Sequence, residues 1–222
     1  QIATRRTLFQ GYTPLDVMLS DLDPIKTALR GVRKYQAALN ALFRPANAAP
    51  GEAHRALVAL NVPLLATTNY DALLEAAEGR PARTDYTWAE ADKALSDLGE
   101  GRKVLFKLHG TADREETVVM TQAEYTKAHA HDTYVRVLSQ LLQQNTFLLL
   151  GYGMNDPLDL DLVLGLNAAA FGSAGRTHYV LMKGASGPDR DRWLRTFNVQ
   201  VIDYQDHAAL PAILRALGAT RP

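Results

Sequence analysis

Three short apolar runs in this chain each end in residues that can form hydrogen bonds or accept protons. These residues are Thr67, Thr68, Asn69 and Asp71 after the first run, His109 and Gly110 after the second, and Gly151, Tyr152 and Gly153 after the third. In an open parallel sheet, ligands bind in the crevice beyond the carboxyl ends of the strands. We therefore expect the three clusters to share one pocket, although they lie about 40 residues apart in the sequence.

The first cluster places an amide and a carboxylate close together. Asn69 donates and accepts hydrogen bonds without carrying charge, so it can hold a hydroxyl group or orient a water molecule. Asp71 lies near the expected start of a helix, where it can bond to backbone amides or face the pocket and accept a hydrogen bond from an amide substituent. A purely structural interpretation, in which both residues cap a strand-to-helix turn, stays open.

The second cluster contains a candidate general base. His109 ends an apolar run and precedes Gly110, which permits a sharp turn. An imidazole can accept a proton near neutral pH, although His109 could also be a turn residue without a chemical role. The other histidines have no comparable position, and we expect them to be structural or surface residues: His54, His129, His131, His178 and His207. Since His129 and His131 lack cysteine or carboxylate neighbours at suitable spacing, we expect no metal site.

The third cluster, Gly151-Tyr152-Gly153, is the weakest of the three signals. Glycine lets the backbone approach a nucleotide or phosphate closely. The fuller Gly-x-Gly-x-x-Gly pattern is absent because Asp156 occupies the position of the third glycine. We expect Asp156 and Pro157 instead to begin the next helix, as its cap and first residue.

Composition limits the classes of partner. The chain has 222 residues, with 24 Lys and Arg against 24 Asp and Glu, so its bulk charge does not indicate nucleic-acid binding or an anionic membrane surface. No apolar stretch approaches the roughly 18–20 residues of a membrane span, and no signal peptide opens the sequence. Cysteine is absent, which excludes disulfides and thiolate zinc sites and is consistent with a cytoplasmic protein.

The hydrophobic pattern changes near residue 63. Before it, helical spacing predicts helices after Pro14, from Asp23 to Phe43 with Asp23 and Pro24 as cap and first residue, and from Glu52 to Leu60. After it, strands and helices alternate. The expected strands are 63–68, 103–108, 117–120, 146–151, 177–182 and 199–203, and the expected helices are 70–78, 88–98, 121–130, 132–144, 157–170, 188–197 and 207–217.

This alternation predicts an α/β fold with a Rossmann-like, doubly wound parallel sheet and right-handed crossovers. The runs at 64–66 and 147–150 are continuously apolar, as expected for strands that are covered on both faces. Residues 1–62 then form an N-terminal helical module, and residues 63–222 form the core that carries the sheet.

In their order and spacing, the clusters resemble those of a sirtuin-like domain, and more closely the bacterial NAD-hydrolysing branch used in antiphage defence than the protein deacylases. Residues 67–71 are similar to the family's Thr-x-Asn-x-Asp segment, and Leu108-His109-Gly110 resembles its catalytic His-Gly. Gly151-Tyr152-Gly153 occupies the position of its glycine motif. A threonine–acid–tyrosine stretch of the bacterial branch is matched by Thr121, Glu124 and Tyr125.

The resemblance implies that the chain is an NAD+ glycohydrolase that releases nicotinamide, with NAD+ as its substrate. It implies that Asn69 holds the nicotinamide ribose or positions water, that His109 is the base and that Asp71 binds the carboxamide. The remaining nucleotide contacts are implied for Thr67, Thr68, Gly151, Tyr152 and Gly153. It further implies the effector domain of a defence protein, regulated by self-assembly into an oligomer or by a sensor partner.

Three departures from the family pattern bear on function. The four zinc-binding cysteines of many deacylases are missing, which argues against recognition of acyl-lysine peptides. Gly153 stands where many relatives carry serine. The opening strand and Gly-Ala-Gly-x-Ser loop are also missing. Either they lie upstream of Gln1, as the non-methionine start favours, or the domain does not bind NAD in the usual way. An NAD-dependent deacylase and a catalytically silent module that senses NAD or ADP-ribose remain the alternatives.

Overall fold

A computed structural model describes residues 15–79, 82–151 and 160–219 of the chain. Several expected features therefore lie outside the described residues, namely Tyr152, Gly153 and the Asp156–Pro157 helix start. The described helices are α2 (Leu15–Gly31), α3 (Tyr35–Phe43), α4 (Glu52–Ala59), α5 (Leu73–Glu78), α6 (Ala91–Gly99), α7 (Gln122–His129), α8 (Asp132–Gln144), α9 (Leu160–Phe171), α10 (Gly187–Phe197) and α11 (Leu210–Ala219). Short 3-10 turns are η1 (Trp88–Glu90), η2 (Glu115–Thr117), η3 (Gly172–Ala174) and η4 (His207–Ala209).

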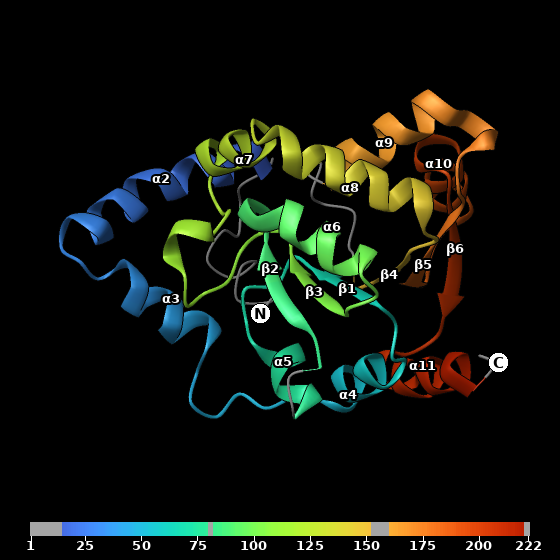
Figure 1. The fold of residues 1–222 in the computed structure, drawn as a ribbon, viewed down its shortest axis with the longest axis horizontal. Coiled ribbons are helices and arrows are strands. Elements are labelled where there is room, and N and C mark those ends of the chain that lie inside the picture. The colour runs from blue at the N-terminus through green and yellow to red at the C-terminus, as the bar shows by residue number, and fades with distance from the viewer. Residues whose placement is uncertain (1–14, 80–81, 152–159, 220–222) are drawn as a thin grey trace.

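All strand pairs of the described residues are parallel. One sheet has the order β1-β3-β2 and the other the order β4-β5-β6. The strands are β1 (Leu64–Thr67), β2 (Thr84–Thr87), β3 (Val104–Lys107), β4 (Leu148–Leu150), β5 (His178–Lys183) and β6 (Val199–Tyr204). In Figure 1, α6 and α8 lie on one side of the sheets, and α4, α5 and α11 lie on the other. The expected Rossmann-like, doubly wound α/β fold is thereby confirmed.

A single apolar core joins the two sheets. It contains Phe106 of β3 and Val180 of β5, both 0% exposed, together with Leu138 of α8. Helix α8 places Tyr134, Val137, Leu138, Leu141 and Leu142 on one buried face, which matches the spacing of an amphipathic helix. Since each fully buried side chain of this size contributes about 1.5–3 kcal/mol, this core is the main source of stability for the strands that carry the polar clusters.

The predicted strand at 117–120 is wrong. Thr117 ends the 3-10 turn η2, and residues 118–120 belong to no described strand. Val118 and Val119 are buried, at 2% and 1% exposed, and the amide of Val119 donates to the carbonyl of His109 over 3.0 Å. Val119 therefore belongs to the main core and Val118 to a second apolar cluster, but neither residue lies in a described strand.

Strand β2 was not expected from the sequence. It has the sequence Thr-Asp-Tyr-Thr and pairs with β3 from Val104 to Lys107. Its first two residues are exposed, so it lacks the apolar pattern by which the other strands were found. A polar strand at the outer side of a sheet carries little signal in the sequence alone.

The predicted helix from Asp23 to Phe43 is also wrong in its boundaries. Pro24 lies inside α2, and α3 begins only at Tyr35. Between these helices Arg33 adopts a left-handed φ of 55°, which ends the first helix. Proline removes one helical hydrogen bond, but the helix continues through it because α2 packs against α7, where Lys26 pairs with Glu124.

The helix predicted at 70–78 is shorter in the structure, where α5 begins at Leu73.

A buried histidine joins β4 to β5. His178 is 3% exposed, and its Nδ1 accepts a hydrogen bond of 3.1 Å from the backbone amide of Phe147. Burial lowers the pKa of His178 below its ordinary value, and the nearby Arg176 lowers it further. Protonation at Nδ1 would turn this acceptor into a donor that faces another donor, so the neutral ring is required at this position.

His178 should therefore make the fold sensitive to acid. Below the ordinary histidine pKa of about 6.5, unfolding takes up a proton at His178, so the free energy of unfolding falls by up to about 1.4 kcal/mol per pH unit. His178→Asn places a non-titrating acceptor oxygen near the position of Nδ1. We expect this variant to show a shallower loss of stability between pH 7 and 5 in urea unfolding, and equal slopes for the two proteins would contradict this role.

Candidate active site at the strand ends

The first two polar clusters lie side by side. Strands β1 and β3 pair in parallel with Thr67 opposite Lys107, so Asn69 and His109 each follow two residues beyond this pair. The amide of Leu108 donates to the carbonyl of Thr67 over 2.9 Å, which extends the pairing past the strands. The crevice rule for parallel sheets thus applies to these two clusters.

The loop after β1 is shaped by its own side chains. The Oγ1 of Thr67 accepts from the amide of Asn69 over 3.1 Å, and Asp71 Oδ1 accepts from the amide of Leu73 over 3.0 Å. Asp71 is buried at 9% exposed, whereas Asn69 is exposed. One oxygen of Asp71 therefore serves the start of α5, as the capping interpretation expects, while Asn69 remains accessible to a ligand.

A lysine that the sequence did not single out supports this loop from the sheet. Lys107 is 0% exposed, and its Nζ lies 2.7 Å from both the carbonyl oxygen of Asp71 and the carboxylate of Glu75. A buried ammonium needs such partners because it has lost its hydration. The signal in the sequence was a charge inside a continuously apolar run, Val-Leu-Phe-Lys-Leu.

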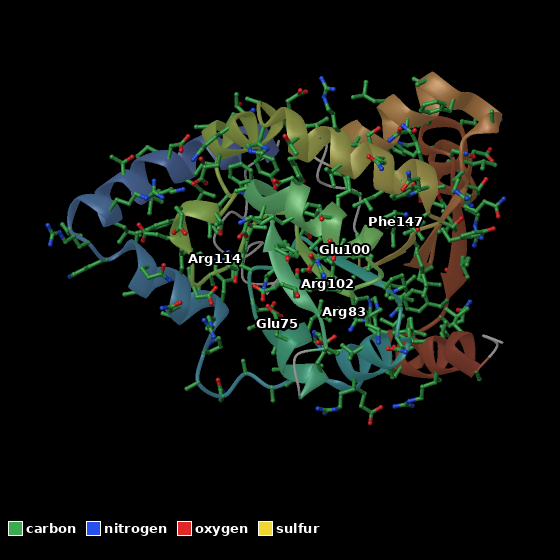
Figure 2. The ribbon with its side chains drawn as sticks, viewed as in Figure 1. Glu75, Arg83, Glu100, Arg102, Arg114 and Phe147 are labelled. Atoms are coloured by element: carbon green, nitrogen blue, oxygen red, sulfur yellow. The ribbon has the colours of Figure 1, made fainter. Side chains whose placement is uncertain are left out.

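A cavity of about 150 Å³ lies next to this ion pair. Its lining residues are Glu75, Glu78, Arg83, Asp85 and Leu105. Figure 2 shows Glu75 and Arg83 on the side of the sheet that faces α5. The Arg83 guanidinium pairs with Glu78 and donates to the carbonyl of Val62 over 2.7 Å. These contacts attach α5 to the sheet on the side away from α6.

The His109 ring lies between two tyrosines. His109 is 4% exposed, with its ring centroid 6.5 Å from that of Tyr70 and 5.2 Å from that of Tyr125. The Tyr70 hydroxyl donates to the carbonyl of Val119 over 2.6 Å, and the amide of Ala112 donates to the carbonyl of Tyr70 over 2.9 Å. These bonds cross-link the two loops, so the imidazole and the amide of the candidate site are held in one unit.

Gly110 is required by a close backbone approach. Its φ is +77°, and a Cβ atom built at this position would lie 2.0 Å from the carbonyl oxygen of Thr117. That same oxygen accepts a hydrogen bond of 2.7 Å from the indole of Trp88. Any side chain at position 110 would therefore displace the turn that follows His109.

Helix α3 covers the loops from outside the sheet. The Phe43 ring lies 4.8 Å from the ring of Tyr70, and Gln36 bonds to the carbonyl of Ala112 and the amide of Glu115. A second apolar cluster contains Tyr35, Leu39, Tyr70, Ala112 and Val118. The residue between Asn69 and Asp71 is thus packed against a helix that precedes the first strand.

The third cluster lies at the end of a strand in the second sheet. Gly151 follows β4, is exposed and has a φ of +64°, and a Cβ atom built there would have no neighbour within 4 Å. The two residues after it, Tyr152 and Gly153, lie outside the described residues. The structure therefore brings the first two clusters together and describes only the first residue of the third.

The remaining histidines have structural contacts. Nδ1 of His54 and Nδ1 of His131 accept from the amides of Gly51 and Tyr134, at the starts of α4 and α8. The His129 ring contacts Tyr125, and His207 contacts the Tyr204 hydroxyl at 2.8 Å. Across the residues that the structure describes, no three His, Asp or Glu side chains are grouped so that they could hold a metal ion.

Fold and site together define a Rossmann-like domain with an amide and a histidine at adjacent strand ends. The profile of the SIR2-like domain family matches residues 63–202, which include both. The chain belongs to this family. None of the helices in the described part of the chain is long and apolar enough to cross a membrane.

Several bacterial proteins are similar to this chain. It is 33% identical over 145 residues to the NAD(+) hydrolase ThsA of Acinetobacter baumannii (strain 532279), an alignment that covers 63% of this chain and 29% of that protein. It is 33% identical over 138 residues to the NAD(+) hydrolase ThsA of Bacillus cereus (strain MSX-D12), covering 60% of this chain and 28% of the relative. The NAD(+) hydrolase ThsA of Enterococcus faecium is 25% identical over 195 residues, covering 75% and 40%. The chain thus spans less than a third of the first two relatives.

Gly110 offers a test of the turn that carries His109. We expect Gly110→Ala to lower the free energy of unfolding by about 3 kcal/mol, since the left-handed φ costs about 1–2 kcal/mol and the clash with Thr117 adds about as much again. Gly101→Ala is the matched control, because Gly101 has the same φ of +77° but open space around it. Equal losses in the two variants, measured by urea unfolding, would show that the close approach to Thr117 is unimportant.

Lys107 offers a second test. Lys107→Met keeps the stem of the side chain but removes the ammonium from Asp71 and Glu75, so we expect a loss of about 2 kcal/mol in the free energy of unfolding. The control is Lys103→Met, since the Lys103 ammonium bonds to the exposed Asn61 and its loss should change stability by less than about 0.5 kcal/mol. A Lys107→Met protein as stable as the control would refute the supporting role.

Proposed function

We propose that this SIR2-like domain hydrolyses NAD+ to nicotinamide and ADP-ribose. The observation that carries the proposal is the register of β1 and β3, which sets an exposed amide, Asn69, beside a buried imidazole, His109. The similarity to proteins named NAD(+) hydrolase ThsA supports the same reaction. Hydrolysis needs one group that orients the ribose or a water molecule and one group that takes a proton, and these two side chains supply both.

The bond that breaks joins nicotinamide to the anomeric carbon of the ribose. In NAD+ the nicotinamide ring carries the positive charge, and it departs as neutral nicotinamide, so no strong acid is needed. The transition state resembles an oxocarbenium ion, as in glycoside hydrolysis. A water molecule attacks from the opposite face, and the imidazole of His109 removes its proton. Asn69 holds the ribose or orients that water, and Asp71 accepts a hydrogen bond from the carboxamide of nicotinamide.

The nucleotide side of the site needs backbone groups. Thr67, Thr68, Gly151, Tyr152 and Gly153 contact NAD+ in this proposal, and Gly151 is supported by its exposed position at the end of β4. Among the described residues, β1 bonds only to β3 and β4 only to β5. Each of these two strands therefore has one edge without a strand partner among the described residues.

The same proposal assigns a role to each part of the chain. Residues 1–62 form a helical module over the nicotinamide side, which is supported by the packing of α3 against Tyr70, and residues 63–222 form the NAD-binding core. The domain is the effector of a cytoplasmic bacterial defence protein that depletes NAD+ during phage infection. Its activity is held off until a sensor partner or assembly into a homo-oligomer releases it, and it binds no nucleic acid or metal itself.

The test is release of nicotinamide from NAD+ alone. We expect the active protein to hydrolyse NAD+ without any peptide, and His109→Ala and Asn69→Ala each to lower turnover by about 10²–10⁴-fold, as expected for lost proton transfer or lost positioning. Both variants should remain folded by circular dichroism, because neither side chain is part of the main apolar core.

The same assay separates the alternatives. A protein deacylase would turn over NAD+ appreciably only when an acyl-lysine peptide is added. A silent sensing module would bind NAD+ or ADP-ribose without turnover, and His109→Ala would then have no effect on any product. Full activity in both variants would end the catalytic assignment.

A further inference from the structure

Tyr125 makes a ring contact with the proposed base. The centroids of the Tyr125 and His109 rings are 5.2 Å apart, and their planes meet at 80° in an edge-to-face arrangement. Tyr125 is 6% exposed and His109 is 4% exposed, so solvent does not compete for this contact. Such pairs contribute about 0.5–1.5 kcal/mol beyond their burial and have a preferred geometry, which restricts the orientation of both rings.

The position of Tyr125 is fixed by a helix cap. Thr121 is the N-cap of α7, and its Oγ1 accepts from the amide of Glu124. The Glu124 carboxylate accepts from the amides of Thr121 and Met120 over 3.0 Å. Glu124 also pairs with Lys26 of α2. The reciprocal bonds of a capping box fix the first turn of a helix. The ring that follows Glu124 in the chain is therefore held by two helices and a cap.

The backbone of His109 is tied to the same segment. The amide of Val119, just before the cap, donates to the carbonyl of His109 over 3.0 Å. Ring and backbone of His109 are thus both attached to residues 119–125, which explains why threonine, acid and tyrosine occur together at this spacing. Resting on the proposed function, we infer that Tyr125 is a positioning residue that holds the His109 imidazole in the orientation needed to take a proton from water.

This role predicts a selective kinetic defect. Tyr125→Leu keeps an apolar side chain but removes the ring, and we expect it to lower kcat for NAD+ hydrolysis by about 10–100-fold, since a misplacement of about 1 Å has effects of this size. The KM for NAD+ should change by less than about threefold, because ground-state binding is not involved. Tyr125→Phe keeps the ring and should restore most of the activity.

Tyr134→Leu is the matched control. Tyr134 is an equally buried tyrosine, at 1% exposed, whose ring packs against Phe106 in the main apolar core. At a temperature where both leucine variants are folded, Tyr134→Leu should retain its kcat. A loss equal to that of Tyr125→Leu would reduce the role of Tyr125 to general packing and overturn the inference.

A second measurement does not depend on activity. In the ligand-free protein, the ring-proton NMR signals of His109, assigned with His109→Gln, should shift in Tyr125→Leu and stay in place in Tyr125→Phe, while those of His54 and His207 do not move. Unchanged His109 signals in Tyr125→Leu would overturn the inference. If the signals shift but His109→Ala hydrolyses NAD+ at the full rate, the contact stands and the proposed base role fails.

Discussion

The parallel pairing of β1 with β3 is the constraint on which the candidate site depends. A register in which Thr67 faces Lys107 brings two loops together that are separated by about 40 residues of sequence. Because side chains alternate along a strand, a slip of one residue would turn Lys107 to the other face and remove it from Asp71 and Glu75. The buried lysine therefore favours this register, because this alignment places its ammonium beside the carbonyl of Asp71 and the carboxylate of Glu75.

The second strand end is held by backbone bonds more than by side chains. Gly110 permits the turn, Thr117 and Trp88 fill the space behind it, and Val119 binds the carbonyl of His109. The imidazole itself packs against the rings of Tyr70 and Tyr125. This division explains why the side chains around His109 are aromatic, since flat rings restrict orientation without adding charge to the site.

The sequence was sufficient to predict helices and strands where the apolar pattern is strong. Strand β3 and helix α8 were predicted almost to the residue, because continuous and amphipathic apolar runs have few other solutions. The order of the strands in the sheet could not be obtained, nor could β2, whose polar residues lie at the outer side. The sequence also predicted that Asn69 and His109 lie at neighbouring strand ends, because ligands bind beyond the carboxyl ends of parallel strands. By contrast, the contacts of Lys107 and Tyr125 join segments that are distant in sequence, and only the three-dimensional structure gives them.

The surroundings of the candidate site include a helix that lies outside the segment matched by the family profile. The match begins at residue 63, yet Phe43 of α3 packs on Tyr70, whose ring neighbours His109. Tyr70 is 7% exposed and packs in one apolar cluster with Tyr35 and Leu39 of α3, and its ring in turn covers part of the imidazole. In the proposed mechanism, an imidazole shielded in this way takes its proton from a bound water molecule and not from bulk solvent. Helix α3 therefore belongs to the chemical environment of His109, although it lies outside the segment by which the family is recognised.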